Sequence, residues 1–219
     1  MYGRVPKVAN SSIKAALSSL LKSKHIEVTR TTSDNFWKEN TRKETCMLSK
    51  YDARMFRGTH FCFSFVRNPF DRLVSAYNNK LLELEEVPGR MQSMGLEHSM
   101  HFRDFLEIIV STNNDKIDLH LLPQSEILCL EKQIIPNFIG RFETMEEDWN
   151  ALQQQLKRER LPMLGKLPKK NVRRESNNRD VPTYFNDPGL IRMVENRYSD
   201  DLEWFYGNKT SDQLIQGNI

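Results

Sequence analysis

Apolar and polar positions along this chain follow two different periods, and both occur in one stretch. The run from Phe61 to Val66 alternates aromatic or branched residues with small ones only. Such a short apolar run predicts a strand covered on both faces. After it, four apolar residues recur at the spacing of one helix face: Leu73, Ala76, Tyr77 and Leu81. The pattern predicts a buried strand followed directly by a helix.

The junction between these two elements carries the first candidate site. Asn68 is a good helix cap, Pro69 is favoured at the first helical position, and Asp71 suits the first turn. Arg67 therefore leaves the carboxyl end of the strand, with Ser75 two turns into the helix. Ligands bind at that edge of open α/β sheets, and an arginine beside a helix start suits phosphate or sulfate. The alternative is a structural salt bridge between Arg67 and a carboxylate such as Asp71.

A second turn of this kind lies at the N-terminus. Tyr2–Val5 predicts a short strand ended by Pro6, and the segment from Lys7 leads into a helix that reaches about Lys24. Asn10, Ser11 and Ser12 are all good cap residues for it. Lysine and hydroxyl groups in a strand–turn–helix are typical of phosphate binding. The turn has no glycine, so it is not a Walker A loop. A surface lysine before a capped helix is the commoner explanation of such a pattern.

The other segments complete an α/β pattern of strands alternating with helices. We expect the following elements: a strand at Ile26–Thr31, a polar loop with some helix at Thr32–Lys43, a helix at Glu44–Phe56, a mobile loop at Arg90–Met100, a helix at His101–Ile109, a strand at Ile127–Leu130, a strand at Phe138–Glu143, a helix capped by Thr144, and a helix at Pro188–Phe205. This order predicts a single domain, residues 1–208, with a central, mainly parallel sheet flanked by helices. Residues 209–219 read as a frayed C-terminal tail.

Composition narrows the functional classes. The 219 residues suit one sizeable domain, and the net charge of +3 is too small to indicate nucleic-acid binding. No apolar run is long enough to span a bilayer, and the N-terminus lacks the apolar segment of a signal peptide. The three cysteines show no zinc-type spacing and fit a reducing compartment. We see no metal-ligand cluster, and the sequence does not indicate an oligomeric state.

The two turns together resemble a known pair of motifs. VPKVANSSIK and FVRNPFDRLVSAYNNK are similar to the two nucleotide-binding signatures of sulfotransferases that use 3′-phosphoadenosine 5′-phosphosulfate (PAPS). The likeness is greatest to the Golgi-type, family 2 carbohydrate sulfotransferases and their bacterial relatives. Further similar segments follow in order: HLLPQSEILC, NFIGRFETMEEDW, LPKKN and RYSDDLEWFYG. The resemblance implies the P-loop-like, nucleotide-binding fold of that superfamily.

The resemblance also implies roles for individual residues. Lys7 would contact the phosphosulfate and stabilise charge on the bridging oxygen. Arg67 and Ser75 would bind the 3′-phosphate. Five residues would form the turn around the 5′-phosphate: Val8, Ala9, Asn10, Ser11 and Ser12. The basic segment from Lys157 to Asp180 is either a solvated loop or a lid. The resemblance favours a lid that closes over the nucleotide, with Lys170 and Arg173, beside Lys169 and Arg174, as candidate ligands.

Sulfuryl transfer to an alcohol needs positioning, electrostatic stabilisation and a general base, but no metal. The candidate bases are His98, His101, His120, Glu83, Glu85 and Glu86. We favour His120, because it opens the HLLPQ motif on the expected acceptor side; the alternative is a structural histidine. The resemblance favours a sugar hydroxyl as acceptor, although a lipid, a peptide or a secondary metabolite would also supply one.

Two other classes of protein compete with this interpretation. A P-loop small-molecule kinase would share the fold, but the Walker A glycines are missing. A catalytically silent nucleotide-binding module would keep the turns and lack the base. For localisation, we expect the cytoplasm if the chain is full length, and the Golgi lumen if it is a trimmed domain.

Overall fold

A three-stranded parallel sheet lies at the centre of the computed structural model, which describes residues 1–22, 31–168 and 180–218. The strand order is β1 (Tyr2–Gly3), β2 (Phe63–Val66) and β5 (Phe138–Arg141). All four residues of β2 are buried, as the apolar run predicted for a central strand. The α/β class and the parallel sheet are therefore confirmed, although the outer strands are shorter than expected.

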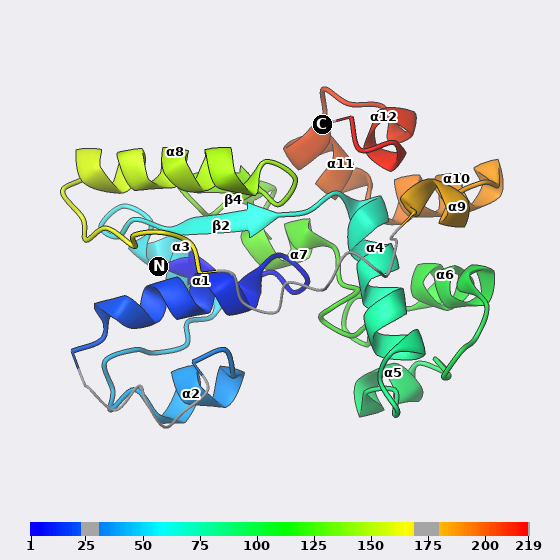
Figure 1. Ribbon diagram of the computed structural model, residues 1–219, viewed down its shortest axis with the longest axis horizontal. Coiled ribbons are helices and arrows are strands. Elements are labelled where there is room, and N and C mark those ends of the chain that lie inside the picture. The colour runs from blue at the N-terminus through cyan, green and yellow to red at the C-terminus, as the bar shows by residue number, and fades with distance from the viewer. Residues whose placement is uncertain (23–30, 169–179, 219) are drawn as a thin grey trace.

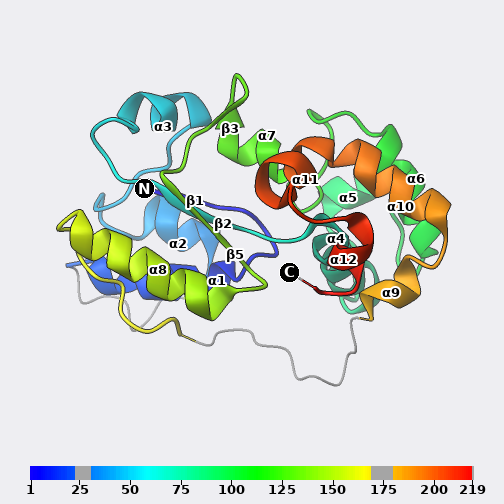
Figure 2. The same ribbon diagram turned by 90° about the horizontal axis from the view of Figure 1, so that it is seen from above.

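Helices cover both faces of this sheet. Helix α1 (Asn10–Leu17) lies on one face and α8 (Met145–Arg158) on the other (Figure 1). Strand β2 points toward α4 (Pro69–Tyr77), and a group of helices gathers beyond its carboxyl end (Figure 2). The further helices of the described residues are α2 (Asp34–Glu39), α3 (Lys50–Phe56), α5 (Gly89–Ser93), α6 (Phe102–Ser111), α7 (Gln124–Leu128), α9 (Val181–Tyr184), α10 (Pro188–Arg197), α11 (Ser199–Tyr206) and α12 (Ser211–Ile215).

The β2–α4 unit forms as the local signals predicted. The Asn68 side chain accepts a hydrogen bond from the Phe70 amide at 3.0 Å, and Pro69 occupies the first helical position. Leu73 and Val74 are 1% and 0% exposed, so α4 is buried in the core. The helix continues into a π-helical turn, η3 (Asn78–Leu82). Such turns are rare in proteins, and those that do occur often lie at functional sites.

Only the second half of the strand expected at Ile127–Leu130 is confirmed, because α7 occupies Gln124–Leu128. The Asp201 carboxylate accepts hydrogen bonds from the Gln124 and Ser125 amides at 2.8 and 2.7 Å. This carboxylate satisfies the free amides at the start of α7, so the segment becomes helical. Only β3 (Cys129–Leu130) is extended, paired with β4 (Gln133–Ile134) in a small antiparallel hairpin.

Other boundaries differ from the predictions for identifiable reasons. Helix α3 begins at Lys50 and not at Glu44, because Ser49 forms a capping box with Asp52. The helix expected at Pro188–Phe205 is two helices, α10 and α11, which meet at Tyr198.

Two segments in which we expected no regular structure contain short helices. The expected loop Arg90–Met100 overlaps α5, in which Met91 is 0% exposed. The expected frayed tail forms α12 behind a Thr210 capping box, with Leu214 buried. The division at residue 208 stays a prediction. Most of the strand expected at Ile26–Thr31 falls outside the described residues.

Candidate functional site

The first turn connects β1 to α1 through backbone in the left-handed region. Lys7 has φ 69° and Ala9 has φ 46°, a conformation that costs a non-glycine residue about 1–2 kcal/mol. Ala9 is the N-cap of α1 and makes no side-chain cap bond, so the prediction of an Asn or Ser cap is wrong. Asn10 instead donates from Nδ2 to the Val5 carbonyl at 2.7 Å, which ties the turn to the end of the strand segment. Helix α1 also ends at Leu17, earlier than expected.

The Lys7 side chain reaches across to the helical half of the molecule. Its Nζ donates to Asn79 Oδ1 at 2.9 Å, and Asn79 lies in the π-helical turn η3. The lysine is only partly exposed. Its ammonium group is therefore held at a defined position beside the end of α4.

The second turn places Arg67 almost wholly inside the protein, with a side-chain exposure of 3%. Its Nε donates to Asp71 Oδ2 at 2.7 Å, which is the ion pair proposed as the alternative to an anion site. Its Nη1 donates to the Lys7 carbonyl at 2.9 Å. The guanidinium also lies 4.2 Å from the centre of the Phe142 ring. The two turns, far apart in sequence, therefore meet at the carboxyl edge of the sheet.

Two other polar side chains, one on α4 and one from the HLLPQ motif, are also buried. Ser75 lies on α4 with 1% exposure. Gln124, from the HLLPQ motif, accepts from the Arg67 amide at 2.9 Å and donates to the Arg67 carbonyl at 2.8 Å. Sequence analysis assigned no role to Gln124, although its motif was noted. The roles of Arg67 and Ser75 as phosphate ligands stay predictions.

His120 forms a pair with an aspartate that sequence analysis missed. Its Nδ1 lies 2.7 Å from Asp118 Oδ1, and the same oxygen accepts from the His120 amide at 2.8 Å. With Nδ1–H donating to the carboxylate, Nε2 is the nitrogen that can take a proton. The Asp-x-His spacing was the available signal, but such pairs are common on surfaces.

Burial, with the charges around it, favours the neutral form of His120. Burial lowers the pKa of His120, the nearby cations Lys80 and Lys7 lower it further, and Asp118 only partly offsets them. Burial alone would raise the pKa of Asp118, but the hydrogen bonds from His120 outweigh it and hold that pKa below its usual range. The charge of Lys7 contributes to this shift, so the two candidate residues lie near each other.

The other candidate bases and the candidate lid residues are either exposed or lie outside the described residues. The other proposed bases have exposed side chains: His98, His101, Glu83, Glu85 and Glu86. Lys169, Lys170, Arg173 and Arg174 lie outside the described residues. Within the described ranges, no group of three or more His, Cys, Asp or Glu residues could hold a metal ion. None of the described helices is long and apolar enough to cross a membrane.

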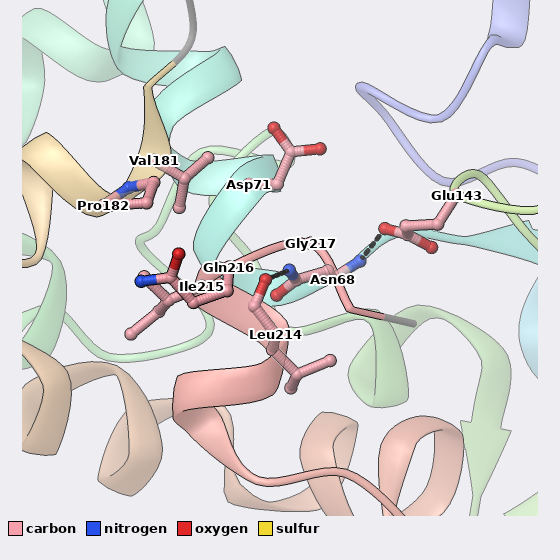
Figure 3. A pocket seen from close by; sticks show the side chains of 9 residues that line it. All are labelled: Asn68, Asp71, Glu143, Val181, Pro182, Leu214, Ile215, Gln216 and Gly217. Atoms are coloured by element: carbon pink, nitrogen blue, oxygen red, sulfur yellow. Dashed lines mark hydrogen bonds between the residues drawn. The ribbon is translucent and has the colours of Figure 1, made fainter.

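A cavity of about 280 Å³ opens beside the second turn (Figure 3). Asn68 lies at its base, where its amide donates to Glu143 Oε1 and its Nδ2 donates to the Leu214 carbonyl, both at 2.7 Å. Asp71 and the end of α12 complete the wall. Burial raises the pKa of Glu143. The cavity thus adjoins the Arg67–Asp71 pair.

Comparisons with known proteins found one family model and several relatives. A model described as "Sulfotransferase family" matches residues 1–207. Carbohydrate sulfotransferase 14 of Homo sapiens is 28% identical over 170 residues, which cover 69% of this chain and 43% of that protein. Carbohydrate sulfotransferase 14 of Danio rerio is 29% identical over 168 residues, covering 68% and 43%. Carbohydrate sulfotransferase 10 of Pongo abelii is 31% identical over 114 residues, covering 41% and 31%. The chain thus spans less than half the length of these relatives. No solved structure was found to match.

Proposed function

Because this chain belongs to the sulfotransferase family, we propose that it transfers a sulfuryl group from PAPS to a hydroxyl group of a carbohydrate. The observation that carries the proposal is the contact between the two turns: Arg67 Nη1 donates to the Lys7 carbonyl at 2.9 Å. One nucleotide with phosphates at both ends can therefore reach both turns. The cationic Lys7 and the start of α1 are suitable partners for such an anion.

Lys7 and His120 divide the chemistry between them. The donor supplies the sulfuryl group, whose bond to the bridging phosphate oxygen breaks as the bond to the acceptor oxygen forms in line. The Lys7 ammonium neutralises negative charge that develops on the bridging oxygen. His120 Nε2 accepts the proton of the attacking hydroxyl, while Asp118 holds the ring and stabilises the charge it gains. A neutral His120 is ready for this step near pH 7, because its pKa is lowered.

The acceptor class rests on the relatives. The matched proteins are named carbohydrate sulfotransferases, and His120 is partly exposed, so an incoming hydroxyl can approach it. We therefore assign the acceptor to carbohydrates. The polar segment Thr32–Lys43 and the segment Arg90–Met100 are the candidate determinants of which sugar is chosen.

The test is a transfer assay with radiolabelled PAPS and a panel of oligosaccharides, run with the wild-type protein and with Lys7→Ala. Label in a glycan product that depends on Lys7 supports the proposal. A parallel thermal-shift experiment compares 3′-phosphoadenosine 5′-phosphate (PAP) with ATP in the presence of Mg²⁺. Stabilisation by ATP but not by PAP would favour a kinase and contradict the proposal.

A further inference from the structure

Arg72 joins the two segments that carry the proposed chemistry. It lies on α4 with 1% exposure, among the most buried large side chains of the described residues. Its Nε donates to the Pro6 carbonyl at 3.2 Å. Its Nη1 donates to the Leu122 carbonyl at 2.9 Å and its Nη2 to the Leu119 carbonyl at 3.3 Å. One guanidinium thus binds main-chain oxygens of two distant segments.

The three carbonyl oxygens that Arg72 binds belong to residues near Lys7 and His120. Pro6 directly precedes Lys7, and Leu119 and Leu122 lie on either side of His120. We infer that Arg72 is a positioning residue, which fixes the His120 segment relative to the Lys7 turn; this inference rests on the proposed function. The Arg67 side chain also contacts the first turn, but the Arg72 side chain bonds Leu119 and Leu122, on either side of His120, as well.

A guanidinium suits this task better than an ammonium group. Its planar fork carries donors that point in different fixed directions, whereas lysine offers a single donor point on a flexible chain. Burying the charge is costly, and burial lowers the pKa of Arg72 while Tyr198 and Asp201 nearby act in the opposite direction. A hydrophobic side chain would fill the same space without that cost, so the carbonyl contacts explain why a cation occupies the position.

The variant Arg72→Lys tests the inference because it keeps the charge and loses the fork. We expect kcat to fall about a hundredfold, the effect of a small misplacement of reacting groups. PAP affinity should change little, since Arg72 does not touch the proposed ligand sites. In the pH profile of kcat, the fall on the acid side (the acidic limb) should move to higher pH. The reason is that a less buried His120 regains a higher pKa. Wild-type kcat and an unshifted limb would overturn the inference.

Arg197→Lys is the matched control. Arg197 Nη2 donates to the Thr112 carbonyl at 3.2 Å and to Asn114 at 2.6 Å, so it also holds a loop through a guanidinium, but away from the first turn. We expect its kcat and pH profile to match the wild type. An equal loss in both variants would mean that any arginine contact of this kind supports activity indirectly, and would overturn the specific role of Arg72.

A measurement on the wild-type protein covers the case in which Arg72→Lys does not fold. The Leu121 and Leu122 amides bond the Asp118 carbonyl, within the segment that Arg72 holds. If the two segments are coupled, saturating PAP should slow hydrogen exchange at both amides; unchanged exchange would overturn the inference. The proposed function fails separately, if the wild-type protein neither binds PAP nor transfers label.

Discussion

The two turns at the carboxyl edge of the sheet are built in opposite ways. In the first turn, Lys7 and Ala9 adopt left-handed backbone, and the lysine side chain extends toward Asn79. In the second, Asn68 and Pro69 start a regular helix, and the Arg67 side chain is buried against Asp71. A partly exposed cation thus stands on strained backbone, and a buried cation stands on regular backbone.

This contrast suggests a division of labour. A partly exposed cation held at a defined position can stabilise charge that develops beside it during a reaction, which suits Lys7 to the transition state. A cation fixed by a carboxylate, a carbonyl and an aromatic ring is already oriented, which suits Arg67 to binding. Substitutions in the first turn should therefore lower turnover as well as affinity for the 5′-phosphate, and substitutions in the second should mainly lower affinity.

Lys7→Ala should have the largest effect. We expect kcat to fall about a hundredfold to a thousandfold, because the ammonium group that stabilises the leaving oxygen is lost. Initial rates with saturating PAPS measure it. Lys50→Ala is the control, since Lys50 lies on α3, outside both turns, and contacts the Glu126 carbonyl. Turnover of Lys7→Ala close to the wild-type value would remove the contrast between the turns.

His120→Gln comes next, with an expected loss of about a hundredfold in kcat, since a general base contributes roughly that much. Glutamine preserves a donor toward Asp118 but cannot accept the proton. PAP affinity, measured by calorimetry, should stay unchanged. Unaltered turnover with the best acceptor would show that another group takes the proton.

Arg67→Ala should weaken PAP binding by about 1.5–3 kcal/mol, the value of a hydrogen bond to a charged group. Asp71→Asn sharpens the test, because it releases Arg67 Nε from its carboxylate partner. If the phosphate and Asp71 compete for the guanidinium, Asp71→Asn should bind PAP at least as tightly as the wild type. A parallel loss in both variants would instead assign Arg67 a structural role.

Lys80→Gln should have the smallest effect. The positive charge of Lys80 lowers the pKa of His120, so its removal raises that pKa. Because the base must be neutral, activity falls as pH drops through this pKa. The wild-type acidic limb should therefore lie below pH 6.5, the ordinary value, and Lys80→Gln should move it upward. A limb that moves downward would contradict the electrostatic account.

Local signals explain which elements the sequence could predict. The β2–α4 unit and α8 were predictable because their apolar period and first-turn residues lie within a few positions of each other. Helix α7 was not predictable from the sequence, because Asp201, which caps it, lies 77 residues away. The break between α10 and α11 falls at Tyr198, whose hydroxyl donates to the distant Leu121 carbonyl.

The residues of the candidate site also include some that the sequence could predict and some that it could not. Lys7, Arg67 and Ser75 were identified because they belong to recognisable motifs. Asp118 and Arg72 were missed, since their importance depends on contacts made only in the folded chain. Arg72 in particular binds main-chain carbonyls, which no pattern of side chains can report.

The central claim is that both turns contact opposite ends of one nucleotide. Calorimetry with PAP, adenosine 5′-phosphate and adenosine 3′-phosphate tests it most directly, in the wild type, Lys7→Ala and Arg67→Ala. We expect a crossed pattern: Arg67→Ala weakens PAP and adenosine 3′-phosphate but not adenosine 5′-phosphate, and Lys7→Ala weakens PAP and adenosine 5′-phosphate but not adenosine 3′-phosphate. If each substitution weakens all three nucleotides equally, or none of them, the claim is contradicted.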